Sequence, residues 1–415
     1  MARLLVIADD LSGACDVGVK FASKGVSILV ANHMISGPPV WPADYEVVVV
    51  NTESRHLRPD EAAQRVRTCV EQAIENRVSH FYKKTDSALR GNIGSELEAL
   101  MIASGCSVLP FMPSFPQLKR TTKDGFQYVN GRLLHETAFA RDPLEPITES
   151  FIPAIIESQS GIQTTLVNTD QIALAQTSNF KNKGIYILDA VTDEDLRLAG
   201  RMLQANNLLA ATAGSSGFAE FLSELLGFEK REQSRVPERG RMLAVCGSLN
   251  EVSLKQTVKG EAYGFGMVTL PQSMLLAADG ANTALGRQFI QRIVELAKQQ
   301  RDVVVSIETT DPSEQQREDG KQTYRLIVQN LGELTRQVLE QTGFKSLTVF
   351  GGDTLLAITR ACGWDGLLPQ HELLPGVVVS RVAGNANAPL LISKAGGFGS
   401  EDVLLQIKSL LGSAN

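Results

Sequence analysis

The chain has 415 residues, and its 40 Lys and Arg against 46 Asp and Glu leave a formal net charge of −6. This length predicts two domains, and the mild acidity argues against general nucleic-acid binding, which needs a basic face. No apolar run reaches the roughly 20 residues that span a bilayer, and the five scattered cysteines match neither a disulfide framework nor a zinc ribbon. We therefore expect a reduced, cytoplasmic protein without a nucleic-acid or membrane partner.

Short apolar runs alternate with longer amphipathic ones through the first half of the chain. Ala62, Val66, Val70 and Ile74 recur at four-residue spacing and predict a helix over 58–77. Alternating strands and helices imply parallel strands joined by crossover helices. The strands predicted up to residue 112 are 4–8, 26–31, 46–51, 80–84 and 107–112.

The middle of the chain is less regular. Segment 113–150 carries turn signals and charges but little periodicity, and alternation then resumes up to about Leu226. Segment 228–240 is dense in charge and contains Pro237 and Gly240, so we interpret 229–240 as an interdomain linker, with a long solvated loop inside one domain as the alternative. The strands and helices predicted here are 185–190, a helix from 193, 208–214 and a helix to 226.

The strand and helix pattern starts again after the linker. We therefore predict an α/β chain of two domains with mainly parallel sheets, over 1–228 and 241–415. The predicted strands are 242–247, 266–270, 302–309, 346–352, 377–380 and 390–399, and the predicted helices are 251–260, 283–300, 316–342, 353–362 and a last one from 401.

Two adjacent carboxylates, Asp9 and Asp10, follow the first predicted strand. Ligands of open α/β sheets bind at the carboxyl ends of strands, and paired carboxylates there suit a metal, sugar hydroxyls or general-base chemistry. Ser12 is placed to cap the following helix. The alternative is that one of the two carboxylates only caps this helix.

A second polar segment follows the strand at 80–84. Cations at a strand end, followed by a Gly-Asn turn before a helix, are typical of an anion cradle. Arg55, after the third strand, is placed to join them, and the alternative is a solvated basic loop. The residues of this segment that we assign to a polyol acid are Lys83, Lys84, Thr85, Asp86, Ser87 and Arg90.

Glycine-rich turns follow several other strands. The turn at 212–222 could donate backbone N–H groups to an oxyanion or could be only a well-capped turn. Two glycine loops in the second half, at different strand ends, are what the phosphates of a nucleotide need, although each alone could be a tight turn. No Walker loop and no protein-kinase catalytic loop occurs. The nucleotide-site candidates are Ser248, Ser253, Gly351, Gly352, Asp353, Thr354, Gly396, Gly397 and Gly399.

Six segments, in order along nearly the whole chain, resemble the four-carbon acid sugar kinases: ADDLSGACD (8–16), KKTDSALRGNIG (83–94), ARDPLEP (140–146), GGDT (351–354), LLPGVVVSR (373–381) and KAGGFGSED (394–402). The resemblance implies an N-terminal sugar-acid domain, a C-terminal nucleotide domain and a ligand cleft between them. It also implies ATP- and Mg²⁺-dependent phosphorylation of O4 of a four-carbon sugar acid.

Within this family, the loop after the fourth strand separates subgroups. The 3-oxo-tetronate kinases resemble KYCSTFDST there, whereas this chain has FYKKTDSALRGN (81–92), so we expect D-threonate, with D-erythronate next and 3-oxo-tetronate after it. The residues at which the resemblance places the acid are Asp9, Asp10, Arg55, Lys84, Thr85, Asp86 and Ser87. Those at which it places ATP are Ser253, Gly351, Gly352, Asp353, Thr354, Gly396 and Gly397. Asp10, Asp86 and Asp353 are the candidate bases, while metal ligands and oligomeric state, a homodimer included, stay open.

Two other classes of protein share parts of this pattern. A nucleotide-dependent dehydrogenase needs a G-x-G-x-x-G fingerprint after the first strand, and that fingerprint is absent. A non-catalytic sugar-acid sensor would share the ligand cleft but would have no use for the glycine loops. The five histidines show no metal-ligand spacing, and we expect them to be structural; the alternative for His135, in the irregular middle segment, is a place at the edge of the site.

Overall fold

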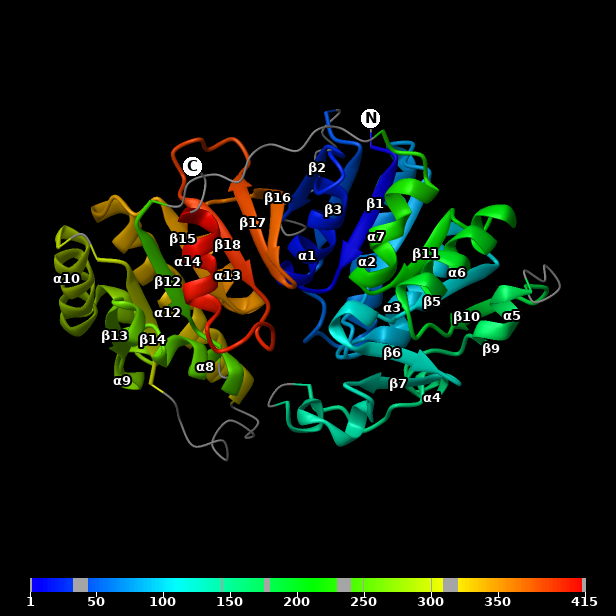
Figure 1. Cartoon of the computed structure of the whole chain (residues 1–415), viewed down its shortest axis with the longest axis horizontal. Coiled ribbons are helices and arrows are strands. Elements are labelled where there is room, and N and C mark those ends of the chain that lie inside the picture. Colours follow the sequence, from blue (N-terminus) through cyan, green and yellow to red (C-terminus); the bar gives the residue numbers. More distant parts are fainter. Residues whose placement is uncertain are drawn as a thin grey trace. The chain divides into compact units, whose positions relative to one another are not determined.

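The computed structural model describes residues 2–32, 44–142, 145–174, 180–229, 240–248, 250–299, 301–308 and 320–412. The chain divides into two compact units, Met1–Glu232 and Gln233–Asn415, which we describe separately (Figure 1). Of the linker that we predict at 229–240, residues 230–239 lie outside the described part of the chain.

Unit 1 is built on a parallel sheet whose described strands run in the order β2-β3-β1-β4-β11-β5-β10-β9. Its central strands are continuous runs of buried aliphatic residues, which is expected when both faces of a sheet are covered. The strands are β1 (Leu4–Ala8), β2 (Ile28–Ala31), β3 (Val47–Asn51), β4 (His80–Lys84), β5 (Val108–Met112), β9 (Thr164–Val167), β10 (Gly184–Leu188) and β11 (Ala211–Gly214).

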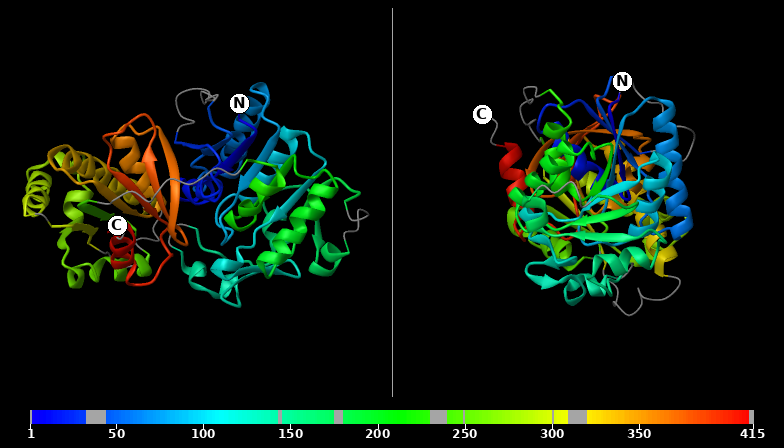
Figure 2. Two further views of the ribbon diagram at one scale, coloured as in Figure 1. Left: turned by 45° about the horizontal axis from the view of Figure 1, so that its top comes forward. Right: turned by 90° about the vertical axis from the view of Figure 1, so that its right-hand side faces the viewer.

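Two groups of helices cover this sheet, one on each face (Figure 2). Helices α2 and α3 pack against each other, and α1 and α6 both contact α7. Leu97 of α3 and Val66 of α2 meet Ile7 of β1 in the main hydrophobic core. The helices are α1 (Leu11–Ala22), α2 (Pro59–Glu75), α3 (Ile93–Ser104), α4 (Ile152–Glu157), α5 (Thr169–Ala173), α6 (Asp193–Ala205) and α7 (Ser216–Leu225).

The segment in which we predict little regular structure contains a small antiparallel sheet of β6 (Arg120–Lys123), β7 (Phe126–Val129) and β8 (Arg132–Leu133). Strands of two to four residues are too short to show a period of two. The Asp-Gly turn at 124–125 and the Asn-Gly turn at 130–131 have positive φ at both residues, as type I′ hairpin turns require. These two dipeptides are the sequence signal for the sheet.

Unit 2 has a sheet in the order β13-β14-β12-β15-β18-β17-β16, in which the first five strands are parallel and the last two pairings antiparallel. Its strands are β12 (Met242–Cys246), β13 (Gly266–Leu270), β14 (Val303–Ile307), β15 (Ser346–Phe350), β16 (Gly366–Leu374), β17 (Val377–Val382) and β18 (Leu390–Lys394). Its helices are α8 (Glu251–Val258), α9 (Gln272–Leu275), α10 (Ala284–Lys298), α12 (Gly320–Gln341), α13 (Gly352–Ala361) and α14 (Val403–Gly412).

The prediction of an α/β chain with mainly parallel sheets is confirmed in both units. Strand β16 is missing from the prediction because Pro369 and the register shift beside it interrupt its pattern. Among the described residues, no helix is long and apolar enough to cross a membrane.

Candidate active site

Three neighbouring strands of unit 1 end at the same level. Ala8, the last residue of β1, pairs with Asn51 of β3 and with Lys84 of β4. Lys84 also pairs with Gly214, the last residue of β11. The loops that follow these strands therefore leave the sheet at one edge, where parallel α/β sheets bind ligands.

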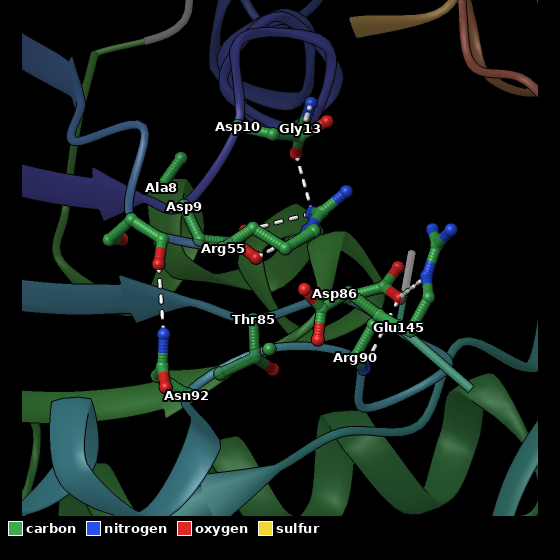
Figure 3. A network of polar contacts seen from close by, with 12 residues as sticks. Ala8, Asp9, Asp10, Gly13, Arg55, Thr85, Asp86, Arg90, Asn92 and Glu145 are labelled. Carbon is green, nitrogen blue, oxygen red and sulfur yellow. Dashed lines mark hydrogen bonds and ion pairs between the residues drawn. The ribbon is translucent and has the colours of Figure 1, made fainter. Parts of the chain in front are cut away.

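Arg55 joins the two carboxylates that follow β1 (Figure 3). Its Nε and Nη2 donate to Asp9 Oδ2 and Oδ1 at 2.7 and 3.0 Å, and Nη2 also donates to Asp10 Oδ1 at 2.7 Å. Burial acts to raise the pKa of Asp9, but the charges of Arg55 and Lys83 outweigh it and hold this pKa below its ordinary value. Nε and Nη2 of Arg55 are thus engaged by carboxylates, Asp9 is ionised, and both aspartates are fixed in place.

Helix α1 is capped by Asp10 and not, as we predict from the sequence, by Ser12. Asp10 has extended backbone angles, and its Oδ1 accepts from the amide of Gly13 at 3.1 Å. Ser12 lies inside the first turn and donates its hydroxyl to Asp10 Oδ2 at 2.6 Å. The helix begins earlier than predicted because Asp is as good a cap as Ser. Gly13 is also needed here, since a Cβ would lie 2.5 Å from Asp10 Oδ1.

The two lysines at the end of β4 have different partners. Lys83 is fully buried, and its Nζ forms an ion pair with Glu96 Oε2 at 3.1 Å. The other oxygen of this carboxylate, Oε1, accepts a hydrogen bond from the Ser54 hydroxyl. Burial raises the pKa of Glu96, although Lys83 opposes the shift. Lys84 donates to the carbonyl of Thr85 at 3.0 Å. Because that bond uses only one of its three protons, Lys84 retains donors for a ligand.

Asp86 lies among cations. Its Oδ2 accepts from Arg90 Nε at 2.6 Å, and Arg90 Nη1 continues to Asp142 at 3.0 Å. Burial opposes ionisation of Asp86, but Arg90, Arg55 and Lys84 outweigh it and hold its pKa far below the ordinary value. Beside it, the Thr85 hydroxyl is buried and has no hydrogen-bond partner among the described residues. An unpaired hydroxyl in a charged, buried edge is a group that a polar ligand can satisfy.

Arg120, which we do not predict from the sequence, belongs to this edge as well. It is the first residue of β6, is only 9% exposed, and has a buried Nε without a hydrogen-bond partner in the described chain. Its guanidinium lies 4.9 Å from the ring centroid of Phe139, the ring that Arg90 approaches at 5.5 Å.

Unit 2 has a corresponding edge. Cys246, Phe350 and Lys394 end three parallel strands at one level. Of the glycines that follow, Gly351 caps α13 with φ +95° and no side-chain cap, which leaves the first amide groups of that helix available. An added Cβ on either Gly351 or Gly396 would lie 3.5 Å from Ser248. The two predicted glycine loops and Ser248 therefore lie together.

Lys394 organises the second glycine loop. This fully buried side chain donates to the carbonyls of Ala395, Gly396 and Phe398 at 2.8, 2.8 and 2.9 Å. Ser253 adds a bond to the Gly396 carbonyl at 2.7 Å, and Gln256 adds bonds to the carbonyls of 398, 399 and 400. Burial lowers the pKa of Lys394 to about 7. Neither Lys394 nor Gln256 is among the residues that we predict.

The inward carbonyls decide where the amides of this loop point. The N–H of a trans peptide points away from its C=O, so the amides of Gly396, Gly397 and Gly399 face away from Lys394. None of them has an acceptor in the described chain. Successive amides that face one side form an anion-binding nest.

Family models match both halves of the chain. One, described as a sugar-binding N-terminal domain, matches residues 4–222, and another, described as a nucleotide-binding C-terminal domain, matches 243–404. The chain is 31% identical to a D-threonate kinase of Salmonella typhimurium, over 97% of this chain and 96% of the relative. This chain belongs to the four-carbon acid sugar kinase family.

Some relatives in this family are named for a substrate other than D-threonate. This chain is 28% identical to a 3-oxo-tetronate kinase of Brucella melitensis, over 98% of the chain and 95% of the relative. A crystal structure of a Salmonella typhimurium LT2 protein superposes with a TM-score of 0.79 at 20% identity, covering 98% of this chain and 99% of that one. At this identity the likeness shows the fold alone.

The structure places the predicted groups of this family member at two edges. The acid-site candidates lie at the strand ends of unit 1 and the nucleotide-site candidates at those of unit 2.

In the turn at 212–222, Ser215 caps α7 by accepting from the amide of Gly217 at 3.0 Å, as the well-capped alternative requires. His56 lies 2.9 Å from Glu145, and His135 lies 2.7 Å from the Ser150 hydroxyl.

Proposed function

We propose that this chain transfers the γ-phosphoryl group of ATP to O4 of D-threonate and forms 4-phospho-D-threonate. The observation that carries the proposal is the edge of unit 1, where fixed carboxylates, donor-bearing cations and an unpaired hydroxyl lie together. Carboxylates accept from sugar hydroxyls, and cations pair with an acid group. An acid with several hydroxyls uses both kinds of group at once.

Each group in unit 1 has a proposed role. Asp9 and Asp10, which Arg55 holds in place, accept from substrate hydroxyls. Thr85 supplies a buried hydroxyl that has no partner in the described part of the chain, and Lys84 supplies ammonium protons beyond the one that it donates to the Thr85 carbonyl. Lys83 supports the edge through its pair with Glu96. The proposed substrate-binding residues are Asp9, Asp10, Arg55, Lys84, Thr85, Asp86, Ser87 and Arg90, with Lys83 behind them in the supporting ion pair.

ATP is assigned to unit 2. The amides of the second glycine loop and of the first turn of α13 donate to phosphate oxygens, as helix N-termini and nests do. Thr354, whose hydroxyl is buried and unpaired in the described structure, adds a donor. The proposed nucleotide-binding residues are Ser248, Ser253, Gly351, Gly352, Asp353, Thr354, Gly396, Gly397 and Gly399.

Mg²⁺ fits this assignment. No group of three His, Cys, Asp or Glu side chains that could form a metal cluster occurs within the described ranges. Mg²⁺ does not require one, because it takes one or two carboxylates and completes its shell with waters and phosphate oxygens. Asp353, in the first turn of α13, is the carboxylate that would hold it. When bound, the ion neutralises charge on the phosphates.

The pKa of Asp86 bears on the choice of base. A carboxylate whose pKa is held far below the ordinary value is a weak proton acceptor. We therefore assign Asp86 to binding and orientation and keep Asp10 as the candidate base for the substrate hydroxyl. Phosphoryl transfer depends chiefly on positioning and electrostatics. Because a base acts in the chemical step and not in nucleotide binding, Asp10→Asn should lower kcat and leave the KM for ATP nearly unchanged.

A substrate panel tests the proposal. Purified protein is incubated with Mg-ATP and, in turn, D-threonate, D-erythronate, 3-oxo-tetronate and the neutral D-threitol, while ADP release is followed. We expect the highest kcat/KM with D-threonate and little activity with threitol. A higher value for either other acid would reassign the substrate. Calorimetric binding of an acid without ADP release would instead favour a sensor.

A further inference from the structure

Arg120 is a buried cation that forms no ion pair with any residue that the structure describes. It is 9% exposed, and no carboxylate in the described chain lies within ion-pair distance of its guanidinium. Burying an unpaired charge is costly, so buried charges are normally paired or bind a ligand. Arg55 and Arg90 show the usual solution, since each of them holds two aspartates.

The strand geometry directs Arg120 toward the acid-site edge. Side chains alternate along β6, so Arg120 shares a face with the buried Thr122, while Lys123 lies on the exposed face. The Thr122 hydroxyl is not available to donate to a ligand, because it donates to Gln127 Oε1 at 2.8 Å. Gln127 in turn donates to the carbonyl of Ser87 at 2.9 Å. The face that carries Arg120 is thus fastened to the 85–87 loop.

The surroundings of Arg120 identify the kind of ligand. Asp86 and Arg90 lie within electrostatic reach of its charge, but the ion pair of Asp86 is with Arg90, whose Nε lies 2.6 Å from Asp86 Oδ2, and not with Arg120. Phe139 covers one side of the guanidinium, which leaves the planar N–H fork for an acceptor in the same plane. A carboxylate matches that fork with two parallel bonds.

We infer that Arg120 binds the carboxylate of the four-carbon sugar acid and so sets the preference of this site for acids over neutral polyols. The inference rests on the proposed function, because it takes the ligand of this edge to be a sugar acid. Arg55, whose Nε and Nη2 are engaged by Asp9 and Asp10, positions those carboxylates and keeps only Nη1 for the ligand. Lys84 is left to contact a hydroxyl or the second carboxylate oxygen.

Calorimetric titration with D-threonate tests this role. Arg120→Gln should raise the Kd for D-threonate about tenfold to 150-fold, the loss expected for a charge-assisted contact. Lys123→Gln removes the same charge from the exposed face of the same strand and should leave Kd unchanged. The Kd for an ATP analogue should not move in either variant. The preference for D-threonate over D-threitol should shrink in Arg120→Gln alone.

Two outcomes separate this inference from the proposed function. If the wild-type protein neither binds nor phosphorylates any four-carbon acid, the proposed function fails, and the inference fails with it. If the wild type phosphorylates D-threonate and Arg120→Gln keeps its Kd and its acid preference, only the inference is overturned. Should Arg120→Gln not fold, Arg120→Lys keeps the charge and lacks the fork, so it should still bind D-threonate at least several-fold more weakly.

Discussion

The candidate edges of the two units occupy the same place in similar sheets but are lined by different chemistry. In unit 1, charged side chains pair with one another, as Arg55 does with Asp9 and Asp10. In unit 2, backbone amides and hydroxyls line the edge, and one buried ammonium, that of Lys394, turns the loop carbonyls inward.

This difference suits the ligands that we propose. A polyol acid presents hydroxyls of several orientations and one charge, so it needs side chains fixed at defined positions. A polyphosphate presents many equivalent oxygens, and backbone amides can approach them closely wherever glycine leaves room. A change of side chain should therefore damage unit 1 most, whereas an added Cβ should damage unit 2.

Replacing Arg55 by Ala should have the largest effect. Removing one partner of a buried ion pair leaves the other charge uncompensated and costs about 3–5 kcal/mol, and Asp9 is only 2% exposed. We expect urea unfolding at pH 7 to show a loss of this size, together with loss of D-threonate binding. Arg58→Ala, which breaks an exposed pair with Asp60, is the matched control and should change stability little.

The loss in Arg55→Ala should depend on pH. In the wild type, Asp9 has a lowered pKa, so its stabilising contribution is present above the ordinary value of 3.8 and is lost as the pH falls through the folded-state pKa. Without Arg55, only Lys83 and Lys84 oppose the effect of burial, so the pKa of Asp9 rises and the variant loses this contribution at pH values where the wild type keeps it. The stability gap between the two proteins should therefore widen from pH 4 to pH 7. An equal gap at both pH values would contradict this account of Asp9.

Replacing Gly396 by Ala should weaken ATP binding without weakening the fold. The added Cβ would meet no protein atom closer than 3.5 Å, but it would stand where we place a phosphate oxygen. The expected increase in Kd for a non-hydrolysable ATP analogue is about tenfold or more, the value of one charge-assisted hydrogen bond. Gly412→Ala, whose Cβ meets nothing within 4 Å, is the control. Unchanged affinity in a folded Gly396→Ala protein would remove this loop from the nucleotide site.

Lys394 offers a subtler test of the same edge. Burial lowers its pKa to about 7, and a bound polyphosphate should favour the charged ammonium. ATP-analogue binding at pH 8 should then take up a fraction of a proton, visible as a binding enthalpy that depends on the ionisation enthalpy of the buffer. The uptake should vanish at pH 6, where Lys394 is already charged, and in Lys394→Met. Uptake that persists in Lys394→Met would assign the proton to another group.

Local rules of sequence were enough to place Asp9, Arg55, Lys84 and Asp86 after strand ends at one edge of a parallel sheet, where such sheets bind ligands. The same rules could not show which of these charged side chains form ion pairs with one another. That Arg55 pairs with Asp9 and Asp10, while Arg120 has no ion pair among the described residues, depends on contacts between residues more than 30 positions apart.

The residues missed in unit 2 have a related cause. Lys394 ends a strand like Lys84 does, but its role depends on the path of the loop that follows it. Gln256 lies on α8 and reaches that loop across more than 140 positions of sequence. The prediction places the cap of α1 at Ser12 and not at Asp10, where the structure has it, because two good capping residues stand close together and sequence alone does not choose between them.

The common level at which β1, β3 and β4 end has a consequence for protein engineering. One residue inserted into any of these strands would shift its end by about 3.3 Å and turn alternate side chains to the other face, so Asp9, Arg55 or Lys84 would lose its neighbours. Gly105, between α3 and β5, lies at the opposite edge of the sheet, is exposed, and has free space around its Cα. An affinity tag or a fluorescent label inserted there should leave ligand binding intact.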